Sequence, residues 1–509
     1  MNFRSVFMLG VAVVWAGLTT VSALAAPAAP PPNIVFILAD DLGYGDLGCF
    51  GQQKIKTPNL DRMAAEGMRL TQHYSGNAVC APSRCVLLTG KHPGHAWIRD
   101  NREVQPEGQP PLPAGTVTLP RLLKKHGYAT GIFGKWGLGF PDAEGDPLEQ
   151  GFDRFFGYNC QRHAHNHYPT YLRDNRQKRA LKNPAFAAHQ KWPPETDPAK
   201  PENYQRYAGE EYAPDLIREE ALRFIRENQA QPFFLYFAST IPHLALQVPD
   251  DSLRVYTGQW NDPPYTGGKN YLPHFTPRAA YAAMITRLDR DAGQLWDLIR
   301  SLGLDENTIF VFSSDNGPVY DRLGGTDSEF FNSAAGLRGF KGSLYEGGIR
   351  VPTLVRWRGK IHAGSTSDRV TGFEDWLPTL LELAGFKQDL KRDELHFDGI
   401  SLAPTLLGKT QKPRPFLYRE FPGYGGQQSI RVGDWKAIRR GLNPRGKATA
   451  EAAPAAELEL YNLRSDPGET QNVAASHPKV VARLERLLRE QHTPSKLFPM
   501  PALDHPTPE

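Results

Sequence analysis

Short runs of apolar residues, most of them β-branched or aromatic, recur along the chain and are separated by long amphipathic segments. Three runs are clear, at residues 33–41, 232–239 and 308–316, and residues 128–133 form a fourth candidate. Runs of this length and composition are typical of strands that are buried on both faces of a parallel sheet. This pattern constrains the fold strongly, because such strands need helices on both sides of the sheet.

Helical patterns lie between these runs. The expected helices are residues 60–66, 214–228 and 278–302. Strands that alternate with helices predict an α/β fold, a three-layer sandwich with a mostly parallel central sheet. In such sheets ligands bind beyond the carboxyl ends of the strands.

The pattern changes near Pro413. Short alternating segments at residues 429–438 and 457–461, followed by an amphipathic helix at residues 478–491, predict a smaller antiparallel sheet with one helix. We therefore expect a catalytic α/β domain over residues 33–413 and a C-terminal subdomain over residues 414–509. Within the first, residues 157–212 are polar, rich in Pro and His and without periodicity, which predicts a lid-like excursion over the domain surface.

The N-terminus has the features of a secretory signal peptide. A short basic start, an apolar stretch at residues 6–18 and a small-residue cleavage site at Ala23-Leu24-Ala25 predict a signal peptide over residues 1–25, followed by a Pro/Ala linker over residues 26–32. The alternative is an uncleaved N-terminal anchor. We expect a periplasmic or secreted protein without a stable membrane anchor, because no stretch approaches the ~20 apolar residues of a membrane-spanning helix.

The charge and the cysteine content bear on nucleic-acid binding and on disulfide formation, respectively. The formal net charge is only +4 and the basic residues form no run, so nucleic acid is not an expected partner. The cysteines do not indicate a disulfide framework; they are Cys49, Cys80, Cys85 and Cys160.

Acidic residues follow two of the predicted strands. Asp40 and Asp41 end the first run, and Asp315 and Asn316 end the third. Adjacent residues of a strand point to opposite faces, so both aspartates can face one ion only if the backbone turns at the strand end. Each pair alone is more often a turn or cap, but together they predict a site of hard oxygen ligands. Such a site favours Ca²⁺, or less strongly Mg²⁺, over Zn²⁺.

The segment Cys80-Ala81-Pro82-Ser83-Arg84 resembles the C-x-P-S-R signature of the type I, formylglycine-dependent sulfatases, which belong to the alkaline phosphatase-like superfamily. Other segments resemble the same family in the same order, and the resemblance runs from Asn33 to about Asn472. These segments are residues 57–61, 134–139, Pro242-His243, 337–352 and 460–469.

The resemblance implies that a formylglycine-generating enzyme oxidises Cys80 to formylglycine (3-oxoalanine), whose hydrated aldehyde is the nucleophile. It implies that Arg84 holds the hydrate, that Lys135 and Lys341 bind the sulfate, and that His243 protonates the leaving oxygen. It also implies a Ca²⁺ ion; its ligands would be Asp40, Asp41, Asp315, Asn316 and the modified Cys80.

One position departs from the family pattern. Gly137 stands where the family has a histidine, so the usual partner of the formylglycine or the sulfate is missing. The alternation of His163, His165 and His167 offers a replacement, because three imidazoles would line one face of an extended segment. An exposed polar loop, a pocket lining and a second metal site with Zn²⁺ or Cu²⁺ remain open. The candidate specificity residues are Arg99, Asn101, His163 and His165.

The expected function is hydrolysis of sulfate monoesters. A sulfated carbohydrate is the favoured substrate, because a long polar lid on an exported enzyme suits a glycan. A formylglycine-dependent phosphodiester or phosphonate monoester hydrolase is the alternative from the same superfamily. A non-catalytic protein that binds sulfated glycans is the third reading, and Gly137 motivates it.

Overall fold

The computed structural model describes residues 30–190, 192–268, 271–320, 322–387, 395–443 and 457–504, together with residues 1, 8 and 10. The chain divides into two units, Met1–Pro30 and Pro31–Glu509, and only a few residues of the first are described. The predicted signal peptide and most of the predicted linker therefore lie outside the described residues. Among those that are described, no helix has both the length and the apolar character needed to cross a membrane.

The second unit is built on a ten-stranded sheet with the order β11-β2-β10-β9-β1-β8-β4-β5-β6-β7. The strands are β1 (Asn33–Ala39), β2 (Met68–Leu70), β4 (Ala129–Lys135), β5 (Arg154–Tyr158), β6 (Tyr171–Asp174), β7 (Gln177–Ala180), β8 (Phe233–Ala238), β9 (Thr308–Ser314), β10 (Thr353–Trp357) and β11 (Ser365–Ser367). The central strands from β9 to β5 are all parallel, whereas β10, β6 and β7 pair antiparallel with their neighbours.

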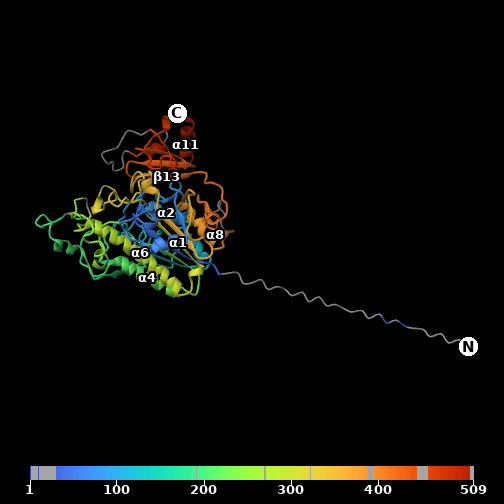
Figure 1. Ribbon diagram of the computed structural model, residues 1–509, viewed down its shortest axis with the longest axis horizontal. Helices are drawn as coiled ribbons and strands as arrows, with labels where there is room; N and C mark the ends of the chain where they lie inside the picture. The colour runs from blue at the N-terminus through green and yellow to red at the C-terminus, as the bar shows by residue number, and fades with distance from the viewer. Residues whose placement is uncertain are drawn as a thin grey trace. The chain divides into compact units, whose positions relative to one another are not determined.

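Helices cover both faces of this sheet. Val35 and Ile37 of β1 belong to the same core cluster as Ile217 of α4, whereas Ile34 and Phe36 pack in the cluster that contains α2 and α8. The helices are α1 (Pro58–Glu66), α2 (Cys80–Thr89), α3 (Leu119–Lys125), α4 (Ala213–Glu227), α5 (Asp250–Leu253), α6 (Pro277–Ser301), α7 (Glu346–Ile349), α8 (Trp376–Leu383), α10 (Ala403–Leu406), α11 (Pro478–Glu490) and α12 (Pro501–Asp504). Figure 1 shows α4 and α6 along one side of the sheet. The predicted sandwich with a mostly parallel sheet is confirmed.

The C-terminal part forms the predicted small antiparallel sheet. It has four strands, β13 (Leu417–Phe421), β14 (Gln427–Val432), β15 (Trp435–Arg440) and β16 (Glu459–Asn462), and α11 packs on it through Leu484 and Leu488. The segment 429–438, which the sequence presents as one alternating run, is a hairpin that turns at Gly433, where φ is 59°. β3 (His73–Tyr74) and β12 (Thr371–Gly372) form a separate two-stranded sheet, and Tyr74 packs with Leu417 and Phe421 of β13.

The segment 157–212, predicted as a lid-like excursion, contains regular structure. Strands β6 and β7 form a hairpin within it and extend the edge of the main sheet beyond β5. Short 3₁₀ helices make up the rest of its regular structure, η2 (His163–His165) and η3 (Pro201–Tyr207). Elsewhere the 3₁₀ helices are η1 (Gly48–Phe50), η4 (Asp305–Asn307), η5 (Leu323–Gly325), η6 (Phe373–Asp375) and η8 (Ala474–Ser476).

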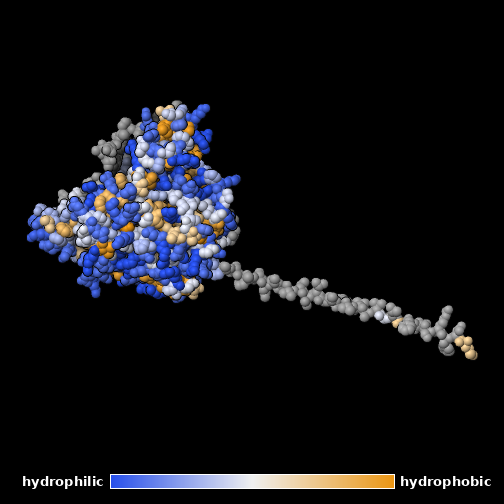
Figure 2. Space-filling model, viewed as in Figure 1, coloured by the Kyte–Doolittle hydropathy of each residue, from blue (hydrophilic) through white to orange (hydrophobic). Residues whose placement is uncertain are grey.

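Buried ion pairs join the small sheet to the main core. Lys436 of β15 places its Nζ 3.0 Å from Glu346 of α7 and 2.8 Å from Glu469, and all three side chains are buried. Arg419 of β13 pairs with Glu374 at 3.0 Å. On the face shown in Figure 2 hydrophilic residues predominate and hydrophobic ones are scattered. Most large apolar side chains are therefore used in the cores.

Candidate active site

Two pairs of polar residues meet beyond the carboxyl ends of β1 and β9. These strands are parallel neighbours that stay in register to their last residues, so Asp40 and Asp41 lie beside Asp315 and Asn316. Asp41 has a φ of 66°, which turns the chain at the strand end as the sequence predicts. Its backbone N–H donates to Oδ1 of Asp315 at 3.2 Å, and all four side chains are buried.

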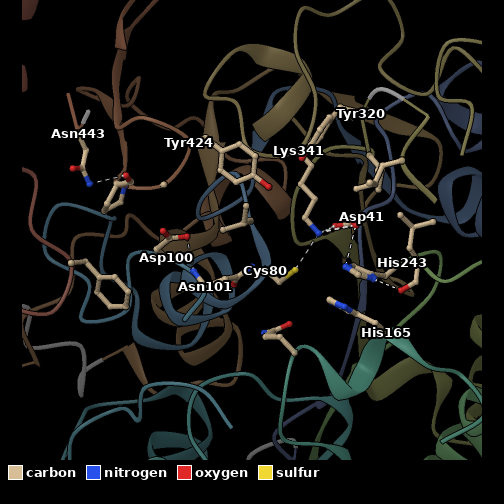
Figure 3. A pocket seen from close by; sticks show the side chains of 18 of the residues that line it. Asp41, Cys80, Asp100, Asn101, His165, His243, Tyr320, Lys341, Tyr424 and Asn443 are labelled. Atoms are coloured by element: carbon tan, nitrogen blue, oxygen red, sulfur yellow. Dashed lines mark hydrogen bonds and ion pairs between the residues drawn. The ribbon is translucent and has the colours of Figure 1, made fainter. Parts of the chain in front are cut away.

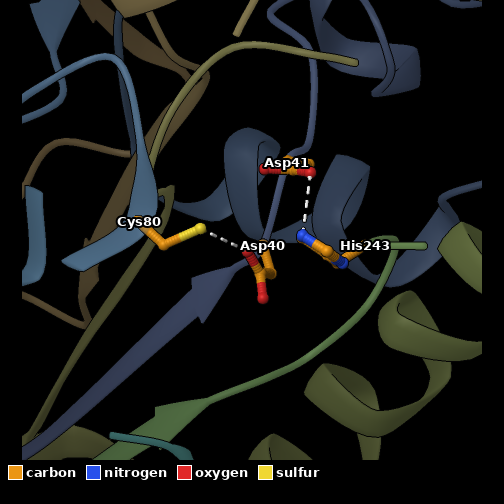
Figure 4. Close-up of side chains that lie close together, drawn as sticks. All are labelled: Asp40, Asp41, Cys80 and His243. Carbon is orange, nitrogen blue, oxygen red and sulfur yellow. Dashed lines mark hydrogen bonds and ion pairs between the residues drawn. The ribbon is translucent and has the colours of Figure 1, made fainter. Parts of the chain in front are cut away.

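The acidic cluster gathers several possible metal-ligand atoms. Asp40, Asp41, Cys80 and His243 each place one possible ligand atom within 4.8 Å of the others (Figure 4). Burial and the neighbouring Asp40 carboxylate raise the pKa of Asp315 to about 7. A cation among these oxygens would relieve that repulsion.

Asn316 supports the same interpretation. Its Nδ2 donates to Asp41 at 2.7 Å and to the Gly317 carbonyl at 2.9 Å, whereas its buried Oδ1 has no hydrogen-bond partner among the described residues. An unpaired buried carbonyl oxygen is costly, and hard cations such as Ca²⁺ are bound by carboxylate and amide oxygens. The residues present therefore fit a hard cation.

Cys80 is the first residue of α2, and its Sγ points at the acidic cluster. The sulfur lies 3.5 Å from Oδ1 of Asp40, 3.5 Å from Nζ of Lys135 and 3.6 Å from Nζ of Lys341. Burial raises the pKa of the thiol to about 12, even with both lysines beside it. An unmodified Cys80 is therefore protonated at neutral pH and is a poor nucleophile.

The two lysines approach Cys80 from opposite parts of the sequence. Lys135, the last residue of β4, is fully buried and lies 2.7 Å from Oδ2 of Asp40. Lys341, in the loop before α7, lies 2.7 Å from Oδ1 of Asp41. Burial alone would lower the pKa of each lysine, but the aspartates outweigh it and raise both values. Both lysines are therefore charged.

Arg84 lies beneath the site. Its guanidinium makes a bidentate contact with Oδ2 of Asp315 at 3.1 and 2.8 Å and donates to the Lys135 carbonyl at 2.5 Å. The side chain is fully buried and does not line the cavity described below. In this arrangement Arg84 positions a carboxylate, and its expected role in holding the aldehyde hydrate stays a prediction.

His243 follows β8 and faces the other side of the cluster. Its Nδ1 lies 2.6 Å from the Leu244 carbonyl oxygen, which fixes this nitrogen as the N–H donor, and its Nε2 lies 3.5 Å from Oδ2 of Asp41. Burial, and then the charge of Lys341, lower the pKa of His243 to about 3. The imidazole is therefore neutral in this state.

The cluster opens into a cavity of about 800 Å³ (Figure 3). At one end, Asp41, His165, His243 and Lys341 surround Cys80. The rest of the lining combines polar and aromatic side chains, and Figure 3 shows Asn443 on the far side of Asp100 from Cys80. The set includes Asp100, Asn101, Tyr424, Asn443 and Phe498. The cavity thus joins a cationic end, with the candidate nucleophile, to an end suited to hydroxyl groups and ring faces.

Two of the four candidate specificity residues line this cavity, and two do not. Asn101 and His165 line the cavity, and the His165 ring stacks on His243 with centroids 4.5 Å apart. Arg99 does not reach it, because its guanidinium is buried against Glu420 at 2.6 Å. His163 lines a separate cavity of about 330 Å³.

The histidine motif is not extended, which changes its geometry. His163 to His165 form the 3₁₀ helix η2, so the three imidazoles do not share one face. His167 is buried and contacts the His243 carbonyl oxygen at 3.0 Å. Of the three histidines, His165 alone lines the cavity that contains Cys80, His163 lines the separate smaller cavity, and the three rings do not converge on one point.

Gly137 packs against the side chain of Gln161, a residue that the sequence analysis did not select. A Cβ atom at Gly137, where φ is +81°, would lie 1.8 Å from Nε2 of Gln161. Gln161 lines the cavity and is 5% exposed. The sequence signal for it was indirect: a polar residue shortly after β5, which pairs with the strand that precedes Gly137. Asp100, Tyr424 and Asn443 carried no comparable signal.

The four cysteines all lie within the described part of the chain, and each is free there. They are Cys49, Cys80, Cys85 and Cys160.

Comparison with known proteins gives a consistent result. Residues 32–386 match the family described as Sulfatase, and residues 339–493 match the family described as N-sulphoglucosamine sulphohydrolase, C-terminal. The chain is 34% identical to arylsulfatase A of Homo sapiens over 494 residues, which cover 90% of this chain and 87% of that protein. It is 33% identical to N-acetylgalactosamine-6-sulfatase of Rattus norvegicus over 484 residues, covering 89% and 83%. Among solved structures, Ps i-CgsB in complex with k-i-k-neocarrahexaose is similar with a TM-score of 0.71 and 25% identity, covering 94% of this chain and 95% of that one.

Proposed function

Because the chain belongs to the sulfatase family and is a sulfuric ester hydrolase, we propose that it removes sulfate groups from a sulfated carbohydrate, with a formylglycine made from Cys80 as nucleophile and Ca²⁺ as the bound ion. The observation that carries the proposal is the position of Cys80. Its Sγ lies within 3.6 Å of two charged lysines and of an aspartate cluster, at the wall of a large cavity.

The thiol itself is unsuited to this reaction, because its pKa of about 12 leaves it protonated. Conversion to formylglycine would place a hydrated aldehyde at the same point, and the hydrate supplies an oxygen nucleophile together with a second hydroxyl. A formylglycine-generating enzyme is therefore the proposed maturation partner. Export to the periplasm or the medium is part of the same proposal.

Asp40, Asp41, Asp315 and Asn316 are the residues that would hold Ca²⁺. When bound, the ion supplies positive charge next to the nucleophile and the sulfate oxygens. Arg84 contributes indirectly, because its bidentate contact fixes the Asp315 carboxylate.

Lys135 and Lys341 carry the electrostatic part of the proposal. In net terms the ester R–O–SO₃⁻ and water become R–OH, sulfate and a proton. The ester S–O bond breaks, a new S–O bond forms to the nucleophile oxygen, and the leaving oxygen takes up a proton. The second hydroxyl of the hydrate then loses its proton, the bond from carbon to the sulfated oxygen breaks to release sulfate, and water adds to the reformed aldehyde to restore the hydrate. Charge moves from the sulfuryl group onto that leaving oxygen, and two fixed ammonium groups stabilise these oxygens without reorganisation.

The proton for the leaving oxygen has two candidate donors, His243 and Lys341. The pKa of His243 is about 3 in the free site, so the imidazole gains its proton only when a bound anion favours the charged form. Lys341 is already charged and lies across Asp41 from His243. We therefore place His243 as the acid of the ester-bound state, with Lys341 as its competitor.

The polar end of the cavity supports a carbohydrate leaving group. Asp100, Asn101 and Asn443 offer hydrogen-bonding groups for hydroxyls, and Tyr424 offers an aromatic face. The relatives named N-acetylgalactosamine-6-sulfatase and the structural neighbour solved in complex with k-i-k-neocarrahexaose support the same substrate class.

The test is release of free sulfate by protein co-expressed with a formylglycine-generating enzyme. The substrates are sugars sulfated at different positions, an aryl sulfate and an aryl phosphodiester, each with Ca²⁺ and with a chelator. Ca²⁺-dependent release from a sugar, lost in Cys80→Ala, is the expected result. Turnover of the phosphodiester alone would replace the proposal with the phosphodiesterase alternative. Binding of sulfated sugar without turnover, once mass spectrometry shows that Cys80 is converted, would replace it with a binding protein.

A further inference from the structure

We propose that the carboxamide of Gln161 hydrogen-bonds the sulfate group of the bound ester, in the space that a side chain at position 137 would otherwise occupy. The inference deepens the proposed function and rests on it for the identity of the ester. It makes Gln161 a positioning residue that carries no charge and transfers no proton.

The first argument is the position of Gln161 relative to Lys135. Strands β4 and β5 are parallel neighbours with Lys135 opposite Tyr158, and the pairing continues past their ends. The Trp136 N–H donates to the Tyr158 carbonyl at 2.9 Å, and the Gly137 N–H donates to the Asn159 carbonyl at 3.2 Å. The turn that follows brings Gln161 back over Gly137, at the same edge of the sheet as Lys135.

The second argument is that the two positions exclude one another sterically. The Nε2 of Gln161 lies 1.8 Å from the place of a Cβ at Gly137, far inside van der Waals contact. Gly137 also has a φ of +81°, which side-chain-bearing residues rarely adopt. The glycine therefore accommodates the glutamine, and the glutamine fills the volume that the glycine leaves.

The third argument is that the carboxamide is unsatisfied in the free protein. Neither Nε2 nor Oε1 of Gln161 has a hydrogen-bond partner in the described parts of the chain, although the side chain is only 5% exposed. A buried amide without partners is costly, about 1–3 kcal/mol per group from mutational data. A ligand in the cavity that accepts and donates hydrogen bonds removes this penalty, which is how a site selects a polar ligand.

The chemistry of the ligand follows from the cavity wall. Gln161 shares the lining with Cys80, Lys341 and His243 at the cationic end. An anionic oxygen drawn to the lysines is an acceptor for the Nε2 hydrogens, and a hydroxyl beside it is a donor for Oε1. A sulfate ester next to a hydrated aldehyde or a sugar hydroxyl provides both. A protonated imidazole would add positive charge at this point, whereas the neutral carboxamide would only orient the ligand through hydrogen bonds.

The test uses Gln161→Leu, which keeps the volume and removes the polar atoms. The readouts are KM for an aryl sulfate, the inhibition constant of inorganic sulfate, and the thermal midpoint. The inhibition constant and KM are expected to rise together, about 10- to 150-fold, the range for a hydrogen bond to a charged group. The thermal midpoint should not fall, because an unpartnered amide is replaced by an apolar group of similar shape.

A matched control is Gln428→Leu in β14, a residue that does not line the cavity. Gln428 is equally buried, but its Nε2 donates to Tyr418 at 2.7 Å and to the Leu488 carbonyl at 3.0 Å. This variant should lose stability and keep the sulfate inhibition constant of wild type. If Gln161→Leu behaves like Gln428→Leu, with a lower midpoint and unchanged sulfate inhibition, Gln161 is structural and the inference is wrong.

A double-mutant cycle tests the interlock with Gly137. Gly137→Ala should displace the carboxamide and weaken sulfate inhibition, whereas in a Gln161→Ala background the same change should add little to that loss. If the two substitutions change the sulfate inhibition constant additively, the side chains at positions 137 and 161 do not compete for one space.

Calorimetric titration of inorganic sulfate into the chain before Cys80 is converted separates this inference from the proposed function. Sulfate binding that weakens in Gln161→Leu supports the inference even if no ester is turned over. Turnover by wild type with sulfate affinity unchanged in Gln161→Leu overturns the inference and leaves the function standing.

Discussion

Replacement of Lys341 by methionine tests the electrostatic core of the proposed mechanism. Methionine keeps most of the apolar stem and removes the ammonium, whose Nζ lies 2.7 Å from Oδ1 of Asp41 and 3.6 Å from the Sγ of Cys80. Two unit charges about 4 Å apart interact by about 4 kcal/mol at an effective dielectric constant of ~20. Only part of a charge develops during the reaction, so we expect a loss of about 10²- to 10³-fold in kcat, as for other preorganised groups that stabilise developing negative charge.

The assay is sulfate release from an aryl sulfate under saturating Ca²⁺. KM should rise as well, because the ground-state sulfate is already anionic. Lys341→Arg keeps the charge and should retain more activity than Lys341→Met. Lys125→Met, at the exposed end of α3, is the matched control and should leave kcat and KM unchanged.

The reasoning also predicts an effect on stability. Without Lys341 the buried Asp41 carboxylate loses its closest cation, and Ca²⁺ should then raise the thermal midpoint more than it does in wild type. A Lys341→Met enzyme with kcat within about tenfold of wild type, or 1.4 kcal/mol, would refute the placement of Lys341 against the sulfuryl group.

Three further outcomes follow from the structure. Lys436→Met should lower the free energy of unfolding by about 3–5 kcal/mol, because it removes the cation that lies between the buried Glu346 and Glu469 carboxylates and leaves Glu346 with the more distant Arg350; denaturant titration measures this loss, and adding Glu469→Gln should recover part of it. Chelation of the ion should lower the thermal midpoint of the mature enzyme, and Ca²⁺ at about 100 times its Kd should restore about 2.7 kcal/mol of unfolding free energy. The Asp41→Asn variant should be stabilised little by Ca²⁺. Stabilisation equal to that of wild type would contradict the assignment of Asp41 as a ligand. Burial raises the pKa of Asp100 to about 7, so this carboxyl is neutral below pH 7 and repels an anionic ester above it; KM should therefore rise as the pH rises through 7, and an unchanged pH profile in Asp100→Asn would exclude Asp100 as the cause.

Much of the acidic cluster was predictable for a simple reason. Asp40 and Asp41 follow one apolar run and Asp315 and Asn316 follow another, and parallel strands bring their carboxyl ends to one edge. Even the turn at Asp41 was required by the alternation of side chains along a strand. These inferences depend only on local pattern and on the direction of the strands.

The failures share a different cause. Arg99 lies one residue from Asp100, yet Arg99 is buried against Glu420 while Asp100 lines the cavity. His163 and His165 were expected on one face, but a 3₁₀ turn directs them into separate cavities. In loops, the direction of a side chain depends on φ and ψ values that tertiary packing fixes, and no periodicity encodes them.

The sequence by itself determined the central strands of the sheet, several of the helices that cover it, the family, and Cys80 as the candidate nucleophile, because these depend on periodicity and on motifs read along the chain. Only the tertiary structure decided that Arg84 contacts Asp315 rather than the cavity, and that Gln161 occupies the space beside Gly137. The protonation states belong to the structure as well. The low pKa of His243 and the high pKa of Cys80 both arise from burial, which only the folded chain creates.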